Sequence, residues 1–204
     1  MFFGKVNMKK LIISGFARSG TSLLANFLNL CGYDTGGSWN QNLNAGWEDE
    51  QFQKIVTTFQ MNPFSEDLIL FLEKEIQKID KTVLKHPRLL MVPELLRIWT
   101  NIFPETSVLV TYRKPIHALE SKKSLGNLGY YTNFSPSELD EKFKIFINTL
   151  INLRIKHNIL YFPDFITEYN EVFHSISALG IHIDKDKGRS IWANLADPSL
   201  VHFR

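Results

Sequence analysis

A glycine-containing segment near the start of the chain has the composition of an anion-binding loop. The sequence LIISGFARSGTSLL, residues 11–24, runs from a short apolar stretch through Gly15 and Gly20 into a helical pattern that begins near Thr21. Glycines let the backbone curl with its N–H groups turned inward, and a helix N-terminus adds partial positive charge. The side chains that can add charge or hydrogen bonds are Arg18, Ser19, Thr21 and Ser22. A phosphate-binding loop is therefore predicted, although Thr21 stands where an ATP-binding loop carries lysine.

Basic side chains also end two further predicted strands. A short strand over residues 82–85 ends at Lys85, and the clearest strand, over residues 107–112, is followed by Arg113. Ser121 comes eight residues after Arg113, which places its hydroxyl two turns along the next helix, on a side that can face the strand end. An arginine and a nearby hydroxyl can bind a second phosphate. Together with the loop, these strand ends predict a ligand with more than one anionic group.

Acidic residues are scarce at the same strand ends. Phosphoryl transfer from ATP usually requires Mg²⁺, which is held by a loop hydroxyl and by a carboxylate at a strand end. Asp164, which follows a predicted strand over residues 159–162, is the only weak candidate for that carboxylate. No metal is therefore expected. A site rich in cations favours a donor whose transferred group carries less charge than a phosphoryl group, and a sulfuryl group has this property.

Strand and helix signals alternate along the chain. The predicted strands span residues 11–14, 82–85, 107–112 and 159–162. Helices are predicted from about residue 21 to Gly32, over 48–59, from a Ser65 cap to about 80, after Pro93 and Pro115, from a Ser135–Glu138 capping box, and before Gly180. Helical crossovers imply a parallel sheet covered on both faces, with ligands bound at the carboxyl ends of its strands. The prediction is a three-layer, P-loop-like α/β fold with a central parallel sheet of about four to five strands, in one domain over residues 1–204.

The composition is ordinary for a soluble protein, with 44% apolar residues, 22% charged residues and a formal net charge of +2. This charge does not indicate a nucleic-acid or membrane partner. Cys31 is the only cysteine, so an intramolecular disulfide and a cysteine-based metal cluster are excluded. The apolar run after Lys9 and Lys10 has only three residues before Ser14, which is too short for a signal peptide or a membrane anchor. The chain is therefore expected to be cytoplasmic.

In order along most of the chain, these segments resemble the PAPS-dependent sulfotransferases, particularly a bacterial branch with an Arg-Ser-Gly-Thr-Ser loop. PAPS is 3′-phosphoadenosine 5′-phosphosulfate. Residues 15–24 resemble the loop that holds the 5′-phosphosulfate, and Arg113 with Ser121 matches the pair that binds the 3′-phosphate. Further segments similar to family motifs are residues 46–49 (GWED), 85–89 (KHPRL), 159–165 and 197–200 (DPSL).

The resemblance implies transfer of a sulfuryl group from PAPS to a hydroxyl or amine of a small-molecule or carbohydrate acceptor, with adenosine 3′,5′-bisphosphate (PAP) as the leaving group. Glu48 is implied as the general base, and Lys85 and Arg18 as the cations that stabilise the bridging and leaving oxygens. The residues implied to hold the 5′-phosphate are Ser19, Gly20, Thr21 and Ser22. Arg113 and Ser121 would hold the 3′-phosphate and so select PAPS over ATP.

The chain is shorter than many members of the family, which implies reduced acceptor-binding insertions, and its sequence departs from the family pattern at two places. His86 occupies the acidic position of the family's Lys-x-Pro-Arg segment, and because it adjoins Lys85 it is an alternative base. A Gly-rich loop for adenine is not clear, and Lys187-Gly188-Arg189 is either its substitute or ordinary surface.

Two other functions stay open: a P-loop kinase of a small molecule, and a nucleotide-binding module of the same fold without activity. Aromatic residues in predicted loops or at helix starts could line an acceptor pocket or belong to the core, and these are Trp39, Trp47, Tyr130 and Tyr131. The sequence does not indicate the oligomeric state.

Overall fold

A single parallel sheet forms the centre of the fold. The computed structural model describes residues 9–40, 45–123 and 134–196. The order of strands in the sheet is β4 (Val83–Lys85), β1 (Lys10–Gly15), β5 (Thr106–Tyr112) and β6 (Lys156–Tyr161), and all neighbours run parallel. Ile13 of β1 lies opposite both Lys85 and Leu109. The predicted α/β fold with a central parallel sheet is confirmed, with four strands.

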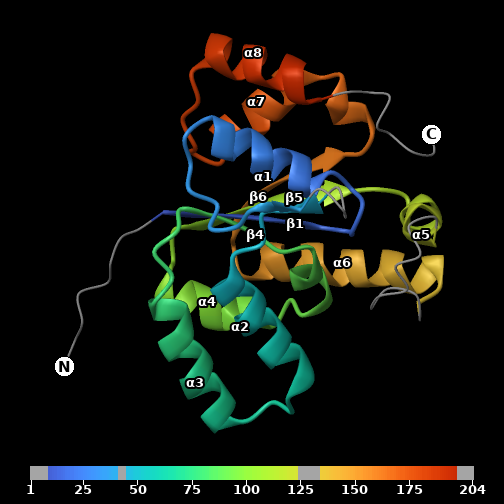
Figure 1. The fold of residues 1–204 in the computed structure, drawn as a ribbon. Helices are drawn as coiled ribbons and strands as arrows, with labels where there is room; N and C mark the ends of the chain where they lie inside the picture. Colours follow the sequence, from blue (N-terminus) through green and yellow to red (C-terminus); the bar gives the residue numbers. More distant parts are fainter. Residues whose placement is uncertain (1–8, 41–44, 124–133, 197–204) are drawn as a thin grey trace.

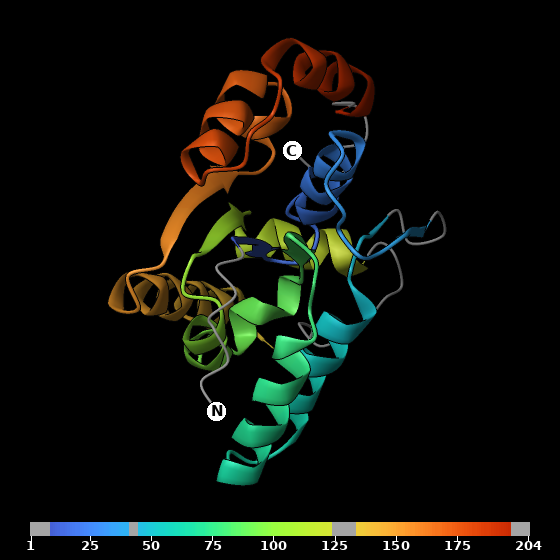
Figure 2. The same ribbon diagram turned by 90° about the vertical axis from the view of Figure 1, so that its left-hand side faces the viewer.

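Helices cover both faces of the sheet (Figure 1). One face carries α1 (Thr21–Leu30), α7 (Tyr169–Ala178) and α8 (Lys185–Leu195). The other face carries α2 (Glu50–Met61), α3 (Glu66–Gln77), α4 (Leu95–Ile102) and α6 (Pro136–Asn152). Helix α5 (Pro115–Lys123) begins just after β5, beyond the carboxyl ends of the strands. Figure 2 shows the α2–α3 pair projecting away from the sheet.

The inner strands have nearly continuous apolar sequences because both of their faces are buried. Successive side chains of a strand point to opposite faces of the sheet. Ile12 and Val108 therefore pack in the cluster formed with α2, α3, α4 and α6, whereas Ile13 and Leu109 pack in the cluster formed with α1, α7 and α8. A sheet covered in this way leaves the carboxyl ends of its strands as the place for a ligand.

Two predicted helix starts are confirmed by their capping hydrogen bonds. Ser65 Oγ accepts a hydrogen bond from Leu68 N at 3.2 Å before α3. Ser135 and Glu138 form the predicted capping box before α6, in which each side chain accepts from the backbone N–H of the other residue. Caps of this kind contribute about 1 kcal/mol each. They fix where two of the helices that cover the sheet begin.

The predicted start of α2 is wrong by two residues. Asp49 Oδ1 accepts a hydrogen bond from Phe52 N at 2.8 Å, so Asp49 is the N-cap and the helix begins at Glu50. Aspartate is a strong N-cap because its short side chain reaches the N–H groups of the first turn. Glu48 therefore lies before the helix. A short antiparallel pair, β2 (Trp39–Asn40) and β3 (Ala45–Gly46), precedes it and was not predicted.

Residues 185–195 form α8, a helix that was not predicted. Asp184 caps this helix, and its Oδ1 accepts a hydrogen bond from Lys187 N at 2.8 Å. Helix α4 begins at Leu95, two residues after Pro93. The 3₁₀ helix η2 (Pro87–Met91) lies between β4 and α4. Another short 3₁₀ helix, η4 (Asp164–Ile166), follows β6. Within the described residues, no helix has both the length and the apolar character needed to cross a membrane.

Candidate active site

The loop between β1 and α1 presents the N-terminus of α1 to the carboxyl end of the sheet. Gly20, the residue before the helix, has a left-handed φ of 87°, and a Cβ there would lie 2.6 Å from Phe165 Cζ. Both the backbone conformation and the neighbouring ring therefore require glycine. In the described part of the chain no side chain caps α1, and its first turn carries no acidic residue. The N–H groups of this turn and the helix dipole are thus available to an anion.

Arg18 connects this loop to β5 and α5. Its backbone is left-handed, with φ 68°, a conformation that costs a non-glycine residue about 1–2 kcal/mol. Its carbonyl oxygen accepts a hydrogen bond from Arg113 Nη1 at 2.8 Å, and its Nε donates to Ser121 Oγ at 3.4 Å. The structure therefore brings together three residues that the sequence assigned to the donor: Arg18, Arg113 and Ser121.

Two guanidinium groups lie near each other in this cluster. Arg113 is buried, and its guanidinium carbon lies 4.8 Å from the centre of the Phe162 ring. Burial lowers the pKa of Arg113, and the positive charge of Arg18 lowers it further. Burial also lowers the pKa of Arg18. Since arginine remains charged in proteins, the two cations repel each other, and a bound anion would reduce that repulsion.

The Ser19 hydroxyl faces the interior, although the resemblance implied that this residue helps to hold the 5′-phosphate. Ser19 Oγ donates to Phe16 O at 2.5 Å and lies 2.5 Å from Thr111 Oγ1, and the side chain is fully buried. This hydroxyl therefore ties the loop to β5 because its single proton is directed inward. The Thr21 side chain is also buried, whereas Ser22 is partly exposed.

Lys85, at the end of β4, connects the loop to Glu48. Its Nζ donates to Ser22 Oγ at 3.0 Å, to Gly46 O at 3.0 Å and to Glu48 Oε1, with which it forms an ion pair. An ammonium group has three N–H donors, so three acceptors satisfy it. Burial lowers the pKa of Lys85, and the negative charge of Glu48 opposes this shift. One buried side chain thus joins the anion loop to the candidate base.

Glu48 lies at the edge of the sheet beside β4. Its side chain is 27% exposed, whereas that of Lys85 is 2% exposed, so the carboxylate is the member of the pair that a second substrate can reach. Glu48 lies one residue before Asp49, the N-cap of α2, and so is not part of that helix. Its Oε1 faces Lys85, an arrangement in which a cation orients a carboxylate base.

The alternative base, His86, is placed unfavourably for that task. It is buried, and its Nδ1 accepts a hydrogen bond from Arg88 N at 3.2 Å. Burial lowers the pKa of His86 to about 3, and the charges of Lys85 and Arg88 contribute to this shift. His86 is buried, whereas the Glu48 carboxylate is partly exposed and can be reached by an acceptor, so the structure favours Glu48 over His86.

Other predicted positions lie elsewhere. Lys187, Gly188 and Arg189 belong to α8, so they do not form an adenine-binding loop. Trp47 packs against the core cluster of α1, α7 and α8. Three predictions lie outside the described residues: Tyr130, Tyr131 and the segment 197–200, as does the side chain of Trp39.

Asp164, the weak candidate for a metal-holding acid, is exposed and begins η4. The described residues contain no group of three or more His, Cys, Asp or Glu side chains arranged to hold a metal ion. Sequence reasoning missed the contact of Gly36 and Gly37 with the segment that carries Glu48. The adjacent glycines were the available signal, since paired glycines mark a tight turn or a close backbone approach.

These observations define an α/β protein with an arginine-containing loop and an uncapped helix N-terminus at the carboxyl end of its sheet. No protein-family model and no curated protein matches the sequence. Solved structures do match. The sulfotransferase from Alicyclobacillus acidocaldarius aligns with a TM-score of 0.54 and 14% identity, over 94% of this chain and 92% of that one. Sulfotransferase STF1 from Mycobacterium tuberculosis H37Rv aligns with a TM-score of 0.50 and 14% identity, over 93% of this chain and 72% of that one. The chain has the sulfotransferase fold.

Proposed function

We propose that the protein is a PAPS-dependent sulfotransferase, which transfers a sulfuryl group to a hydroxyl or amine of an acceptor and releases PAP. One observation carries the proposal: Arg18, Arg113 and Ser121 converge at the N-terminus of α1 through the Arg113 Nη1–Arg18 O and Arg18 Nε–Ser121 Oγ contacts. Such a cluster suits a ligand with separate anionic groups, as PAPS has.

The loop between β1 and α1 and the arginine cluster would each bind a different phosphate group of the donor. The backbone N–H groups that begin α1, with the Thr21 and Ser22 hydroxyls, would hold the 5′-phosphate. Arg113 and Ser121 would hold the 3′-phosphate, which ATP lacks. The Ser22 oxygen accepts a hydrogen bond from Lys85, so its own proton is free to be donated to an anion.

Glu48 and Lys85 would act in the sulfuryl-transfer step. The acceptor oxygen or nitrogen attacks sulfur, the bond from sulfur to the bridging oxygen breaks, and the electron pair leaves with PAP. Glu48 takes the acceptor proton. Lys85 and Arg18 stabilise the negative charge that develops on the bridging and leaving oxygens, an electrostatic contribution that is usually large in group transfer.

The acceptor class stays a small molecule or carbohydrate. Glu48 lies beside the edge strand β4 and its carboxylate is partly exposed, so we expect an acceptor to approach at this edge. The expectations of a cytoplasmic protein with no nucleic-acid or membrane partner stay predictions.

The proposal is tested by incubating the protein with ³⁵S-labelled PAPS and a panel of sugars, phenols and amines, and measuring both labelled product and PAP. Labelled product with the wild-type chain, and about 10²–10⁴-fold slower formation with Glu48→Gln, is the expected result. PAP binding without turnover on any acceptor would favour the silent module. Transfer of phosphate from ATP in the presence of Mg²⁺, with no PAPS turnover, would favour the kinase.

A further inference from the structure

We propose that Gly37, in the turn formed by residues 34–37, is a positioning residue that sets the location of the Glu48 carboxylate. The inference rests on the proposed function and deepens it, because it names what places the base. The turn formed by residues 34–37 is called the 34–37 turn below.

The backbone of the 34–37 turn touches the backbone that carries Glu48. A Cβ on Gly37 would lie 2.5 Å from the carbonyl carbon of Trp47 and 2.7 Å from the carbonyl oxygen of Glu48. A Cβ on Gly36 would lie 2.3 Å from Asp49 Oδ2. Real Cβ atoms do not approach other atoms this closely. Because neither glycine has a side chain, residues 47–49 can lie this close to the 34–37 turn, and a side chain at either position would push them away.

The chain before Glu48 packs on one face of the sheet, and the chain after it packs on the other face. The Trp47 side chain packs in the cluster of α1, α7 and α8, whereas Phe52, whose N–H is capped by Asp49, packs in the cluster of α2, α3 and α4. The chain passes from one layer to the other between these two residues. Glu48 lies in this connecting segment and forms an ion pair with Lys85 of the edge strand β4.

The conformation of the chain around Trp47 and the 34–37 turn lowers the stability of the protein. Trp47 has a left-handed φ of 69°, which is unfavourable for a large side chain. Its Nε1 is buried, and so is Thr35 Oγ1 in the 34–37 turn, and neither atom has a hydrogen-bond partner within the described residues. Strained or unsatisfied groups of this kind concentrate at functional sites. The observed outliers therefore point to a geometric role for this contact.

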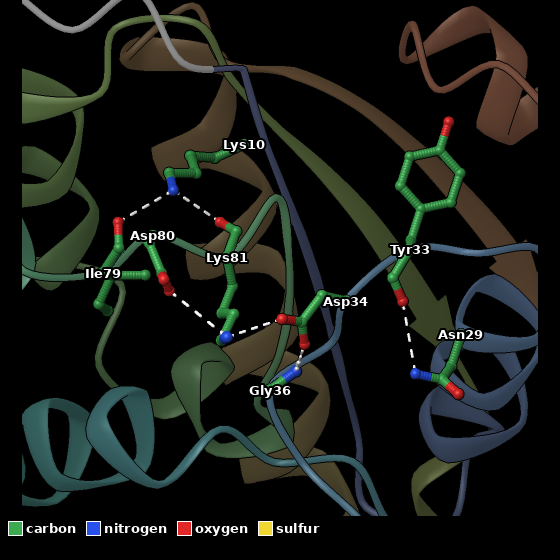
Figure 3. A network of polar contacts seen from close by, with 8 residues as sticks. All are labelled: Lys10, Asn29, Tyr33, Asp34, Gly36, Ile79, Asp80 and Lys81. Atoms are coloured by element: carbon green, nitrogen blue, oxygen red, sulfur yellow. Dashed lines mark hydrogen bonds and ion pairs between the residues drawn. The ribbon is translucent and has the colours of Figure 1, made fainter.

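The 34–37 turn is itself fixed, as Figure 3 shows. Asp34 Oδ1 accepts a hydrogen bond from Gly36 N at 2.9 Å, and Asp34 Oδ2 pairs with Lys81 Nζ at 2.6 Å. The ion pair is exposed and therefore a weak restraint, so the hydrogen bond from Gly36 N to Asp34 Oδ1 is the main local contact within the turn. Lys81 lies two residues before β4, the strand that ends at Lys85. Residues 81–85 therefore contact both the 34–37 turn, through Lys81, and the Glu48 carboxylate, through Lys85.

The test is Gly37→Ala in the full chain, with release of PAP from PAPS as the readout, and with water or an acceptor found in the panel as the sulfuryl acceptor. The contact at Gly37 must open by about 1 Å to reach ordinary van der Waals distance. Since a displacement of this size can cost ~10²-fold in rate, we expect turnover to fall by about that factor. PAP affinity should stay within about twofold, because the anion loop is not displaced.

Gly32→Ala is the matched control. Gly32 lies in the same connection, with a φ of 101°, and a Cβ there would have no atom within 4 Å, so alanine lowers stability without pushing on Glu48. Gly37→Ala combined with Glu48→Gln should be no slower than Glu48→Gln alone, because Gly37 acts only through that carboxylate. If Gly37→Ala does not fold, Asp49→Ala displaces the same segment from its other side and should also reduce turnover while sparing PAP binding.

The outcomes separate the two proposals. A wild-type chain that neither binds PAP nor turns over PAPS overturns the proposed function. A wild-type chain that does both, with full turnover in folded Gly37→Ala, overturns the role of Gly37 alone. The role of Gly37 would also be contradicted if the turnover losses of Gly37→Ala and Glu48→Gln multiplied in the double variant. A loss of turnover in Gly32→Ala as large as that in Gly37→Ala would contradict it as well.

Discussion

The donor side and the Glu48 side of the site are built in different ways. On the donor side, the glycine-containing loop, Arg113 and Ser121 follow directly from β1 and β5, the two central strands. On the other side, Glu48 belongs to no helix or strand and lies beside β4, at the edge of the sheet. Its position depends on contacts with Lys85 and Gly37 from distant parts of the chain.

Under the proposed function, this difference would separate donor binding from catalysis in the molecule. The donor side is fixed by buried backbone and by the interior hydroxyl of Ser19, so it should tolerate changes near Glu48. The Glu48 side is held by two glycines, a strained Trp47 and one ion pair, so small displacements there should affect turnover first. Variants on the two sides are therefore expected to have separable effects on PAP affinity and on rate.

Glu48→Gln should have the largest effect. Loss of the general base is expected to reduce sulfuryl transfer by about 10²–10⁴-fold, while PAP affinity changes little. Glutamine keeps an oxygen that can accept from the buried Lys85, so the lysine is not left without this partner. Rates of PAP release and PAP binding isotherms on the same sample check this. Undiminished turnover would remove Glu48 from the role of base.

The Glu48 side should also make the protein sensitive to acid through His86. Its pKa is about 3 in the folded chain, against an ordinary value of 6.5, so the unfolded chain binds a proton first as the pH falls. The stability associated with neutral His86 is therefore complete above pH 6.5 and is lost progressively towards pH 3. The loss is on the order of 4 kcal/mol.

His86→Asn isolates this contribution, because asparagine can still accept from Arg88 N but does not titrate. Urea unfolding at several pH values between about 7 and 4 should give a flatter pH dependence for the variant than for the wild type. Parallel curves for the two proteins would show that His86 is not the group responsible.

On the donor side, Arg113→Met should weaken PAP binding by about 10–100-fold, since a charge-assisted hydrogen bond contributes ~1.5–3 kcal/mol. Binding of 5′-AMP, which lacks the 3′-phosphate, should change much less. Calorimetric titration of both nucleotides gives the ratio directly. An equal loss for PAP and 5′-AMP would mean that Arg113 supports the loop through Arg18 O and does not read the 3′-phosphate.

Asp49→Ala should have the smallest effect on stability, about 1 kcal/mol from loss of the α2 cap. Ser65→Ala removes a comparable cap from α3, far from Glu48 along the chain, and is the control. Thermal unfolding should show similar losses for the two variants. Turnover should fall only in Asp49→Ala, and equal turnover in both would argue that residues 47–49 are not held in place by their cap.

The donor side and most of the fold could be predicted because their signals are local. The loop that contains Gly20, the strand that ends before Arg113 and the Ser135 capping box each occupy a few consecutive residues, and the structure contains all three. Helical spacing predicted that Ser121 faces the strand end at Arg113, but its contact with Arg18 Nε was not predicted.

The Glu48 side could not be predicted in the same way. The start of α2 depended on whether Asp49 or Glu48 capped the helix, and the approach of Gly37 depends on packing between segments about ten residues apart. The burial of His86, which disfavours it as the base, and the inward turn of the Ser19 hydroxyl depend on neighbours from other elements. Helix α8 was missed although Asp184 offered a capping signal, because Lys187-Gly188-Arg189 also had the composition of a loop.

The most direct measurement is a side-by-side titration of the wild-type chain with PAP, with 5′-AMP, and with ATP in the presence of Mg²⁺. If the arginine cluster selects a donor with a 3′-phosphate, PAP should bind about 10–100-fold more tightly than 5′-AMP, and more tightly than ATP with Mg²⁺. Tighter binding of ATP with Mg²⁺, together with equal affinities for PAP and 5′-AMP, would contradict the sulfotransferase proposal.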